Sequence, residues 1–162
     1  MCADHPAMPA GKVIAIFIAS KPAEPMRNVE SIEAVAGAGL RGDRKFRDAS
    51  HPKKNTPERE LTLIESEAID GVNRDYPLRI EPIETRRNLL TSGVALNHLV
   101  GREFSIGTVR LRGVMLCEPC SHLEKLTRQG VMRALTHRGG LRAQILEGGR
   151  ISVNDAIEIT PA

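Results

Sequence analysis

The sequence predicts a mainly β fold, either a β-barrel or a sandwich of short strands with a few short helices inserted. Three observations support this prediction. Short apolar runs rich in β-branched residues recur along the chain. Glycines stand between many of these runs, as is typical of tight turns. The segments with a helical pattern are all short. Because we find no internal repeat, low-complexity segment or linker, we expect one domain over residues 1–162.

The first half of the chain contains the clearest strand and the longest loop. The run that follows Gly11 is apolar and β-branched, which predicts a strand buried on both faces, and Pro22 ends it. Acidic residues at the start of the first helix suit the positive end of the helix dipole. In order, we expect a strand at 11–19, a weaker strand at 29–36, an extended loop at 47–57, a strand at 61–64 and a helix that begins at 65–69.

The second half alternates short strands with short helices. Gly101, Gly107 and the Gly148-Gly149 pair mark turns between its elements. In order, we expect a strand at 88–91, a helix at 94–100, strands at 102–106 and 108–117, helices at 121–126 and 131–135, and strands at 141–146 and 151–159.

Composition narrows the classes of function. Aromatic residues make up 2% of the chain, so the stacking platforms of single-stranded nucleic-acid binders lack support. A net charge of +3 is too small to indicate nucleic acid as a partner. No apolar run approaches the ~18 residues of a membrane helix, and the N-terminus has no signal-peptide pattern. We therefore expect no nucleic-acid or membrane partner, and, with only three cysteines, a reducing cytoplasmic location.

The most informative feature is the sequence Cys117-Glu118-Pro119-Cys120, which follows a predicted strand. A thiolate is a strong nucleophile and a ligand for soft metals. Cys120 precedes a predicted helix, where backbone N–H groups would favour its thiolate form. Both Cys117 and Cys120 are therefore candidate catalytic residues.

Other interpretations of this pair remain open. A structural zinc site needs four ligands, and the only further candidates are Cys2, His5 and His122. A thioredoxin-like dithiol would require a βαβ pattern, of which the sequence gives few signs. An inert core cysteine is the commonest role of a single cysteine, but a closely spaced pair at the end of a strand weakens that interpretation.

Two basic segments are candidates for binding anions. Arg86, Arg87 and Asn88 precede a strand; arginines can pair with phosphate or carboxylate, and asparagine can hydrogen-bond the edge of a heterocycle. A surface charge pair is the simpler alternative. The turn at 39–44, with Gly42 and Arg44, could bring backbone N–H groups close to an anion. Between Arg41 and Arg59 seven basic residues stand against three acidic ones, which suits either a phosphorylated ligand or a solvated loop.

These segments occur in an order that resembles the MOSC domain, named for the C-terminal domain of molybdenum cofactor sulfurases. The resemblance rests on the ordered set and covers about residues 12–160. Its segments are 39–44, 61–65, 86–89, 101–107, 117–120, 138–143 and 148–149.

The resemblance implies a MOSC-type β-barrel of mostly antiparallel strands and binding of molybdenum cofactor, a pterin dithiolene with a phosphate tail. It implies that Cys120 is the molybdenum ligand or a persulfide carrier, with Cys117 as a resolving cysteine or second sulfur carrier. It further implies that Arg86, Arg87, Arg44 and Gly42 hold anionic groups and that Asn88 contacts the pterin.

Activity is less constrained than fold. The resemblance allows reduction of N-hydroxylated substrates, with a redox partner, or non-catalytic delivery of cofactor or sulfur to a partner metalloenzyme. Protein partners would then be donors or acceptors of cofactor or sulfur. We expect neither the additional N-terminal β-barrel region of the family's reductases nor the desulfurase domain of the sulfurases, so pyridoxal phosphate is not expected to bind to this chain alone. A zinc-stabilised structural domain is the weaker alternative.

Overall fold

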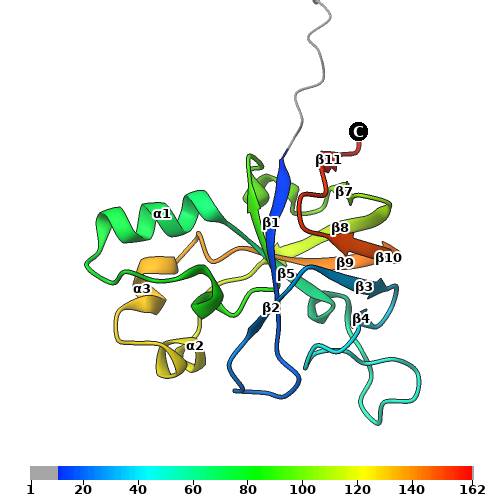
Figure 1. Ribbon diagram of the computed structural model, residues 1–162, viewed down its shortest axis with the longest axis horizontal. Helices are drawn as coiled ribbons and strands as arrows, with labels where there is room; N and C mark the ends of the chain where they lie inside the picture. The colour runs from blue at the N-terminus through cyan, green and yellow to red at the C-terminus, as the bar shows by residue number, and fades with distance from the viewer. Residues whose placement is uncertain (1–10, 162) are drawn as a thin grey trace, which may run out of the picture.

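The computed structural model describes residues 11–161, and these residues form a mainly β structure of two sheets with three α-helices (Figure 1). The larger sheet has eight strands in the order β11-β7-β8-β9-β5-β6-β1-β2, and the smaller has the order β10-β3-β4. The strands are β1 Lys12–Ile18, β2 Arg27–Val29, β3 Ser31–Val35, β4 Gly39–Leu40, β5 Leu61–Glu65, β6 Leu89–Ser92, β7 Glu103–Ile106, β8 Val109–Leu116, β9 Leu141–Glu147, β10 Gly149–Ser152 and β11 Ile157–Ile159. The α-helices are α1 Ser66–Asp75, α2 Ser121–Leu126 and α3 Val131–Leu135, and three short 3-10 helices lie at Pro57–Arg59, Pro82–Thr85 and Leu96–Leu99.

The predicted mainly β class and the mostly antiparallel pairing are confirmed. One strand pair, β5 with β6, is parallel, and α1 lies between these two strands in the chain. This connection is the expected one, because parallel neighbours need a crossover and a helix is its usual form. The expectation of a barrel is only loosely met. Within the described residues the sheets do not close, because β11 and β2 stand at the two ends of the larger sheet.

The core has two parts. The larger lies between the two sheets, where residues such as Leu40 and Ile151 of the smaller sheet pack with Leu61, Phe104 and Leu111 of the larger one. All five side chains are at most 1% exposed, and burying each contributes about 1.5–3 kcal/mol. The second part packs the three helices, which lie together on the left in Figure 1, against the outer face of the larger sheet.

The predicted element at 151–159 is wrong in one respect. It is two strands in different sheets, β10 paired with β3 and β11 paired with β7. The chain turns between them at residues 153–154, where Asn154 has a φ of 78°, a left-handed conformation that asparagine tolerates well. The apolar pattern crosses this turn without interruption, so it could not reveal the break.

The predicted helix at 94–100 is shorter than expected, a 3-10 helix over Leu96–Leu99 that ends before Gly101. Among residues 11–161, no helix has both the length and the apolar character needed to cross a membrane.

Candidate functional site

The loop at 117–120 leaves the end of β8 and leads directly into α2. The Cys117 side chain is buried, with 1% exposed, and its backbone N–H donates to the Gly140 carbonyl at 2.7 Å. Cys120 is exposed and is the residue that precedes the first turn of α2. Both cysteines are free. The two predicted thiols therefore differ: one faces the core, and the other is open to a ligand or partner.

Arg87 holds this loop in place through hydrogen bonds. Its Nε donates to the Gly139 carbonyl at 2.7 Å, its Nη2 to the Cys117 carbonyl at 2.9 Å and its Nη1 to the Thr85 carbonyl at 3.3 Å. The side chain is 8% exposed, and burial lowers the pKa of its guanidinium. Because all three nitrogens are already bonded to carbonyl oxygens, Arg87 acts as a clamp on the cysteine loop, and its predicted role of holding an anion is not supported.

The turn at Gly139-Gly140 is the other half of this clamp. A Cβ atom on Gly139 would lie 2.4 Å from the Cys117 carbonyl oxygen, and one on Gly140 would lie 2.0 Å from that of Leu63. Gly140 also has a φ of 111°, in the region that favours glycine. This turn can lie so close to the Cys117 carbonyl and to β5 only because its two residues have no side chains.

Glu118 connects the same loop to His137. Its Oε1 accepts the backbone N–H of His137 at 2.7 Å, and its Oε2 lies 2.9 Å from His137 Nδ1. Thus Arg87 and Glu118 each connect the loop to the segment that follows α3.

The turn at 39–44 is organised by Asp43, which is 6% exposed. Its carboxylate accepts the backbone N–H groups of Ala19 at 3.2 Å and Lys45 at 3.3 Å, and pairs with Arg44 Nη1 at 3.2 Å. Gly42 has a φ of 89° and an exposed backbone. The turn is therefore held by a buried acid, and Gly42 provides its left-handed residue.

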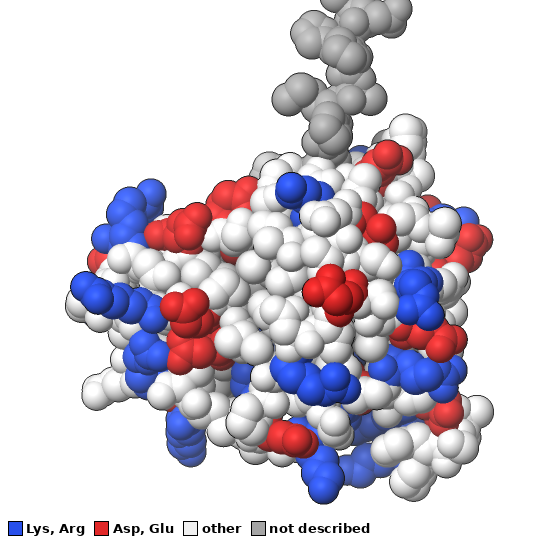
Figure 2. All heavy atoms as spheres, viewed as in Figure 1, with Lys and Arg blue, Asp and Glu red and all other residues white. Residues whose placement is uncertain are grey.

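Lys45 and three arginines place a concentration of positive charge beside the cysteine loop. The pKa of Lys45 is lowered to about 8, first by burial and then by the charges of Arg44, Arg142 and Arg87, while Cys117 acts in the opposite direction. Within the described residues, burial and neighbouring charges shift the pKa of this amine, and no hydrogen bond contributes to the shift. Figure 2 shows several Lys and Arg side chains along the lower edge of the molecule, toward which β2 and the loop after β4 extend in Figure 1. We call Arg44, Lys45 and Arg142 the basic cluster, since Arg87 is already fully bonded.

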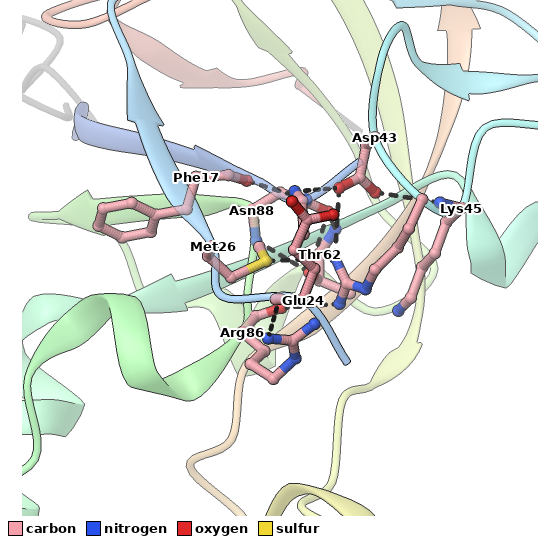
Figure 3. Close-up of polar contacts among 10 residues, drawn as sticks. Phe17, Glu24, Met26, Asp43, Lys45, Thr62, Arg86 and Asn88 are labelled. Carbon is pink, nitrogen blue, oxygen red and sulfur yellow. Dashed lines mark hydrogen bonds and ion pairs between the residues drawn. The ribbon is translucent and has the colours of Figure 1, made fainter. Parts of the chain in front are cut away.

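Asn88 lies inside the fold. Its Oδ1 accepts from the Thr62 N–H at 3.1 Å and from Thr62 Oγ1 at 3.2 Å, while its Nδ2 donates to the Phe17 carbonyl at 3.1 Å (Figure 3). It is 1% exposed. The amide thus connects β1, β5 and the start of β6, so the predicted contact with a pterin is not supported by this position.

Arg86 turns away from Arg87. Its Nη1 donates to the Glu24 carbonyl at 2.8 Å, and its own carbonyl accepts from Arg44 Nη2 at 3.3 Å (Figure 3). The turn at 39–44 and the Arg86-Arg87 pair therefore meet, although 42 residues separate Arg44 from Arg86. The Arg86 side chain lines a groove at the far end of α2, beside Leu126.

Three residues of the site were not predicted as such. Asp43, Lys45 and Arg142 lay in segments that the sequence singled out, but their roles depend on neighbours distant in the chain. A signal for Asp43 was available, because an aspartate directly after a glycine turn often accepts nearby backbone N–H groups. Nothing local distinguishes Lys45 from the exposed lysines of the same loop.

The zinc alternative receives no support from residues 11–161, where no group of three or more His, Cys, Asp or Glu side chains could hold a metal ion. Cys2 and His5, two of its candidate ligands, lie outside the described residues. A cofactor that supplies its own metal and needs a single cysteine is not affected by this observation.

Comparison with known proteins establishes the family. The model of the MOSC domain matches residues 50–158, more than half of the chain, and the chain therefore belongs to the MOSC domain family. This family is associated with binding of molybdenum cofactor or with sulfur transfer. No curated protein sequence matches the chain.

Solved structures share the fold at low sequence identity. The YuaD protein from Bacillus subtilis is 18% identical, with a TM-score of 0.76 over 92% of this chain and 94% of that one. YiiM from Escherichia coli is 18% identical, with a TM-score of 0.66 over 93% of this chain and 70% of that one. YiiM from Geobacillus stearothermophilus is 13% identical, with a TM-score of 0.69 over 93% and 75%. At these identities the likeness shows a common fold.

Proposed function

We propose that this chain binds molybdenum cofactor, with Cys120 as the protein ligand to molybdenum and the basic cluster as the site for the cofactor's anionic groups. The observation that carries the proposal is an exposed thiol on a loop that lies beside a group of cationic side chains, Arg44, Lys45 and Arg142. When bound, the cofactor would supply two-electron redox chemistry at the metal.

The residues fit such a group. A soft thiolate is a suitable ligand for a thiolate-rich metal centre. Lys45 is held among like charges, and an anion would remove this unfavourable interaction. Arg44 also donates to the Arg86 carbonyl, so a further cationic residue lies next to the cluster.

The chain's own residues would orient the ligand and handle protons. Arg87 and Glu118 fix the loop, so the position of Cys120 is set before anything binds. The Lys45 amine, with a pKa of about 8, can release or accept a proton near neutral pH. Together these features suit the reduction of an N-hydroxylated substrate, in which protons must reach the oxygen that leaves.

Sulfur transfer is the second candidate, favoured by the exposure of Cys120. The Cys120 thiolate would attack the outer sulfur of a donor persulfide, and the donor cysteine would leave as a thiolate. Cys120 would then carry the sulfur as a persulfide, with no net oxidation or reduction. Because Cys117 is buried, it is poorly placed to receive sulfur from a partner.

The test is to purify the protein without oxygen from cells that make molybdenum cofactor and to measure molybdenum, pterin and cyanide-labile sulfur per chain. We expect molybdenum and pterin in the wild type and loss of molybdenum in Cys120→Ser, with Cys117→Ala as the matched control that retains it. Labile sulfur without molybdenum, lost in Cys120→Ser, would identify the carrier instead. Turnover of an N-hydroxylated compound by the loaded protein separates an enzyme from a delivery protein. If Cys120→Ser retains molybdenum and sulfur at wild-type levels, both functions are refuted.

A further inference from the structure

A groove with an unusual arginine lies at the end of α2 that is farther from Cys120. It has a volume of about 220 Å³ and is lined by Ala23, Pro25, Met26, Ile83, Glu84, Arg86, Leu126 and Thr127. At about 30 Å³ for each water molecule, this is room for about seven of them, or for a small organic molecule. Five of its eight lining residues are apolar, and Arg86 and Glu84 are its charged residues.

Arg86 is the polar group without a complete set of partners. Its Nη1 donates to the Glu24 carbonyl, but its Nη2 is buried with no hydrogen-bond partner within residues 11–161. A buried donor that has lost water and gained no acceptor is unfavourable, and such groups are uncommon unless a ligand or water completes them. The arrangement indicates a missing acceptor.

The charges around the groove leave Arg86 unbalanced. Both oxygens of Glu84 are in use: Oε1 pairs with Arg128, and Oε2 accepts the Glu81 N–H at 2.8 Å. Asp43, which acts weakly on Arg86, is paired with Arg44 at 3.2 Å. Burial and the Arg44 charge together lower the pKa of Arg86. An additional negative charge is therefore what the groove lacks.

We propose that this groove binds a small carboxylic acid with an apolar body, whose carboxylate pairs with the guanidinium of Arg86 in the groove lining and whose body packs on Pro25, Met26, Ile83 and Leu126. A carboxylate matches the planar donors of a guanidinium, and the apolar lining disfavours a fully hydrated ion such as phosphate. Because a six-residue helix rises about 9 Å, the ligand would lie about that far along α2 from Cys120. The inference goes beyond the proposed function, since it requires neither molybdenum nor a sulfur donor.

The test uses benzoate as the probe with the full chain, followed by backbone amide shifts in two-dimensional NMR. Benzamide has the same ring without the charge, and acetate has the charge without the ring. We expect benzoate to shift the amides of Ala23, Ile83 and Thr127, and to bind about tenfold or more tightly than either control, because a charge-assisted bond and ring burial act together.

Two variants test the contacts separately. Arg86→Gln keeps a side chain with a Cβ at this left-handed position, where φ is 61°, so it adds no backbone strain, and it should weaken benzoate about tenfold or more. Leu126→Glu changes a residue that is 38% exposed, so the fold should tolerate it, and its carboxylate should repel benzoate by a similar factor. Arg133→Gln, at an exposed arginine of α3 that does not line the groove, is the matched control and should bind like the wild type.

Equal affinity for benzoate and benzamide would overturn the proposal, as would shifts confined to residues outside the groove. Undiminished benzoate binding in folded Leu126→Glu would overturn it independently of how Arg86→Gln folds. Loss of molybdenum binding has no bearing on these measurements, so failure of the proposed function and failure of this inference can be told apart.

Discussion

Replacing Lys45 with methionine should make the ligand-free protein more stable at neutral pH. Methionine has a similar length and no charge, so the substitution removes the ammonium group from among Arg44, Arg142 and Arg87 while filling the same space. The effect should be largest at pH 7 and should shrink as the pH rises.

The magnitude follows from the pKa. The pKa of a lysine amine is ordinarily 10.5, and the pKa of Lys45 in the folded protein is about 8. Because its pKa is lowered on folding, the unfolded chain binds this proton more tightly, and the group destabilises the native state fully below pH 8 and progressively less up to pH 10.5. A difference of 2.5 units, 10.5 minus 8, corresponds to about 3.4 kcal/mol at 1.36 kcal/mol per unit. The same relation gives about 1.4 kcal/mol at pH 9.5 and approaches zero above pH 10.5.

Those figures are upper limits, because the half-buried amine can move toward water. We expect Lys45→Met to raise the free energy of unfolding by about 1–3 kcal/mol at pH 7 and by less than half of that at pH 9.5. Urea unfolding at both values measures it, and the exposed Lys53→Met is the matched control, for which we expect no comparable change between the two.

The result that would refute this reasoning is a difference between Lys45→Met and wild type that is the same at pH 7 and pH 9.5. Such a difference would come from methionine packing, which does not depend on pH. If Lys45 also binds the cofactor's anionic groups, the more stable variant should retain less molybdenum, an example of the exchange of stability for function that is common at binding sites.

Three further predictions concern the cysteine loop. Arg87→Leu should lower the free energy of unfolding by about 3–5 kcal/mol, because it leaves three carbonyl oxygens without donors. Urea unfolding measures this loss, and a value below about 1 kcal/mol would contradict the role of Arg87 as a clamp. Gly140→Ala should yield little folded protein, since its Cβ would lie 2.0 Å from a carbonyl oxygen. The Cβ of Gly42→Ala would meet no atom within 4 Å, so this variant should lose only about 1–2 kcal/mol of stability, because of its positive φ. Cys120→Ser should unfold like the wild type, whereas Cys117→Ser, which buries a hydroxyl, should lose about 1–3 kcal/mol of stability. Equal stabilities of the two variants would contradict the difference in burial between the two cysteines.

Most strands could be predicted from the sequence because their signals are local. The run at 11–19 is apolar except for Lys12 and forms β1, which lies one strand in from the β2 edge of the larger sheet. The helices at 121–126 and 131–135 were also predicted with the observed bounds. Closure of a barrel, by contrast, depends on which strands pair at the sheet edges. No local pattern around β2 or β11 contains that information.

The site was predictable as a set of segments but not as a set of roles. The sequence singled out the segments 39–44, 86–88 and 117–120 as candidate site residues. In the structure Arg44 does contact Arg86. It could not show that Arg87 and Asn88 face inward, because neighbouring residues differ in burial only through the packing around them. Arg86 is in a left-handed conformation after a 3-10 helix, and this single backbone feature directs it and Arg87 to different places.

In this protein, the partners of each cationic side chain distinguish structural from functional positions. Cations with a full set of partners hold the fold, and cations without one mark candidate binding sites. Arg87 is bonded to three carbonyl oxygens, and this arrangement is complete without a ligand. Lys45 is partly buried among like charges, and Arg86 Nη2 is buried with no hydrogen-bond partner in the described residues. Such groups are uncommon inside proteins because each is unfavourable, and they are found mainly where a ligand completes them. An anion beside Lys45 and a carboxylate at Arg86 should therefore each stabilise the fold by more than their contact areas suggest, since each would also remove an existing cost.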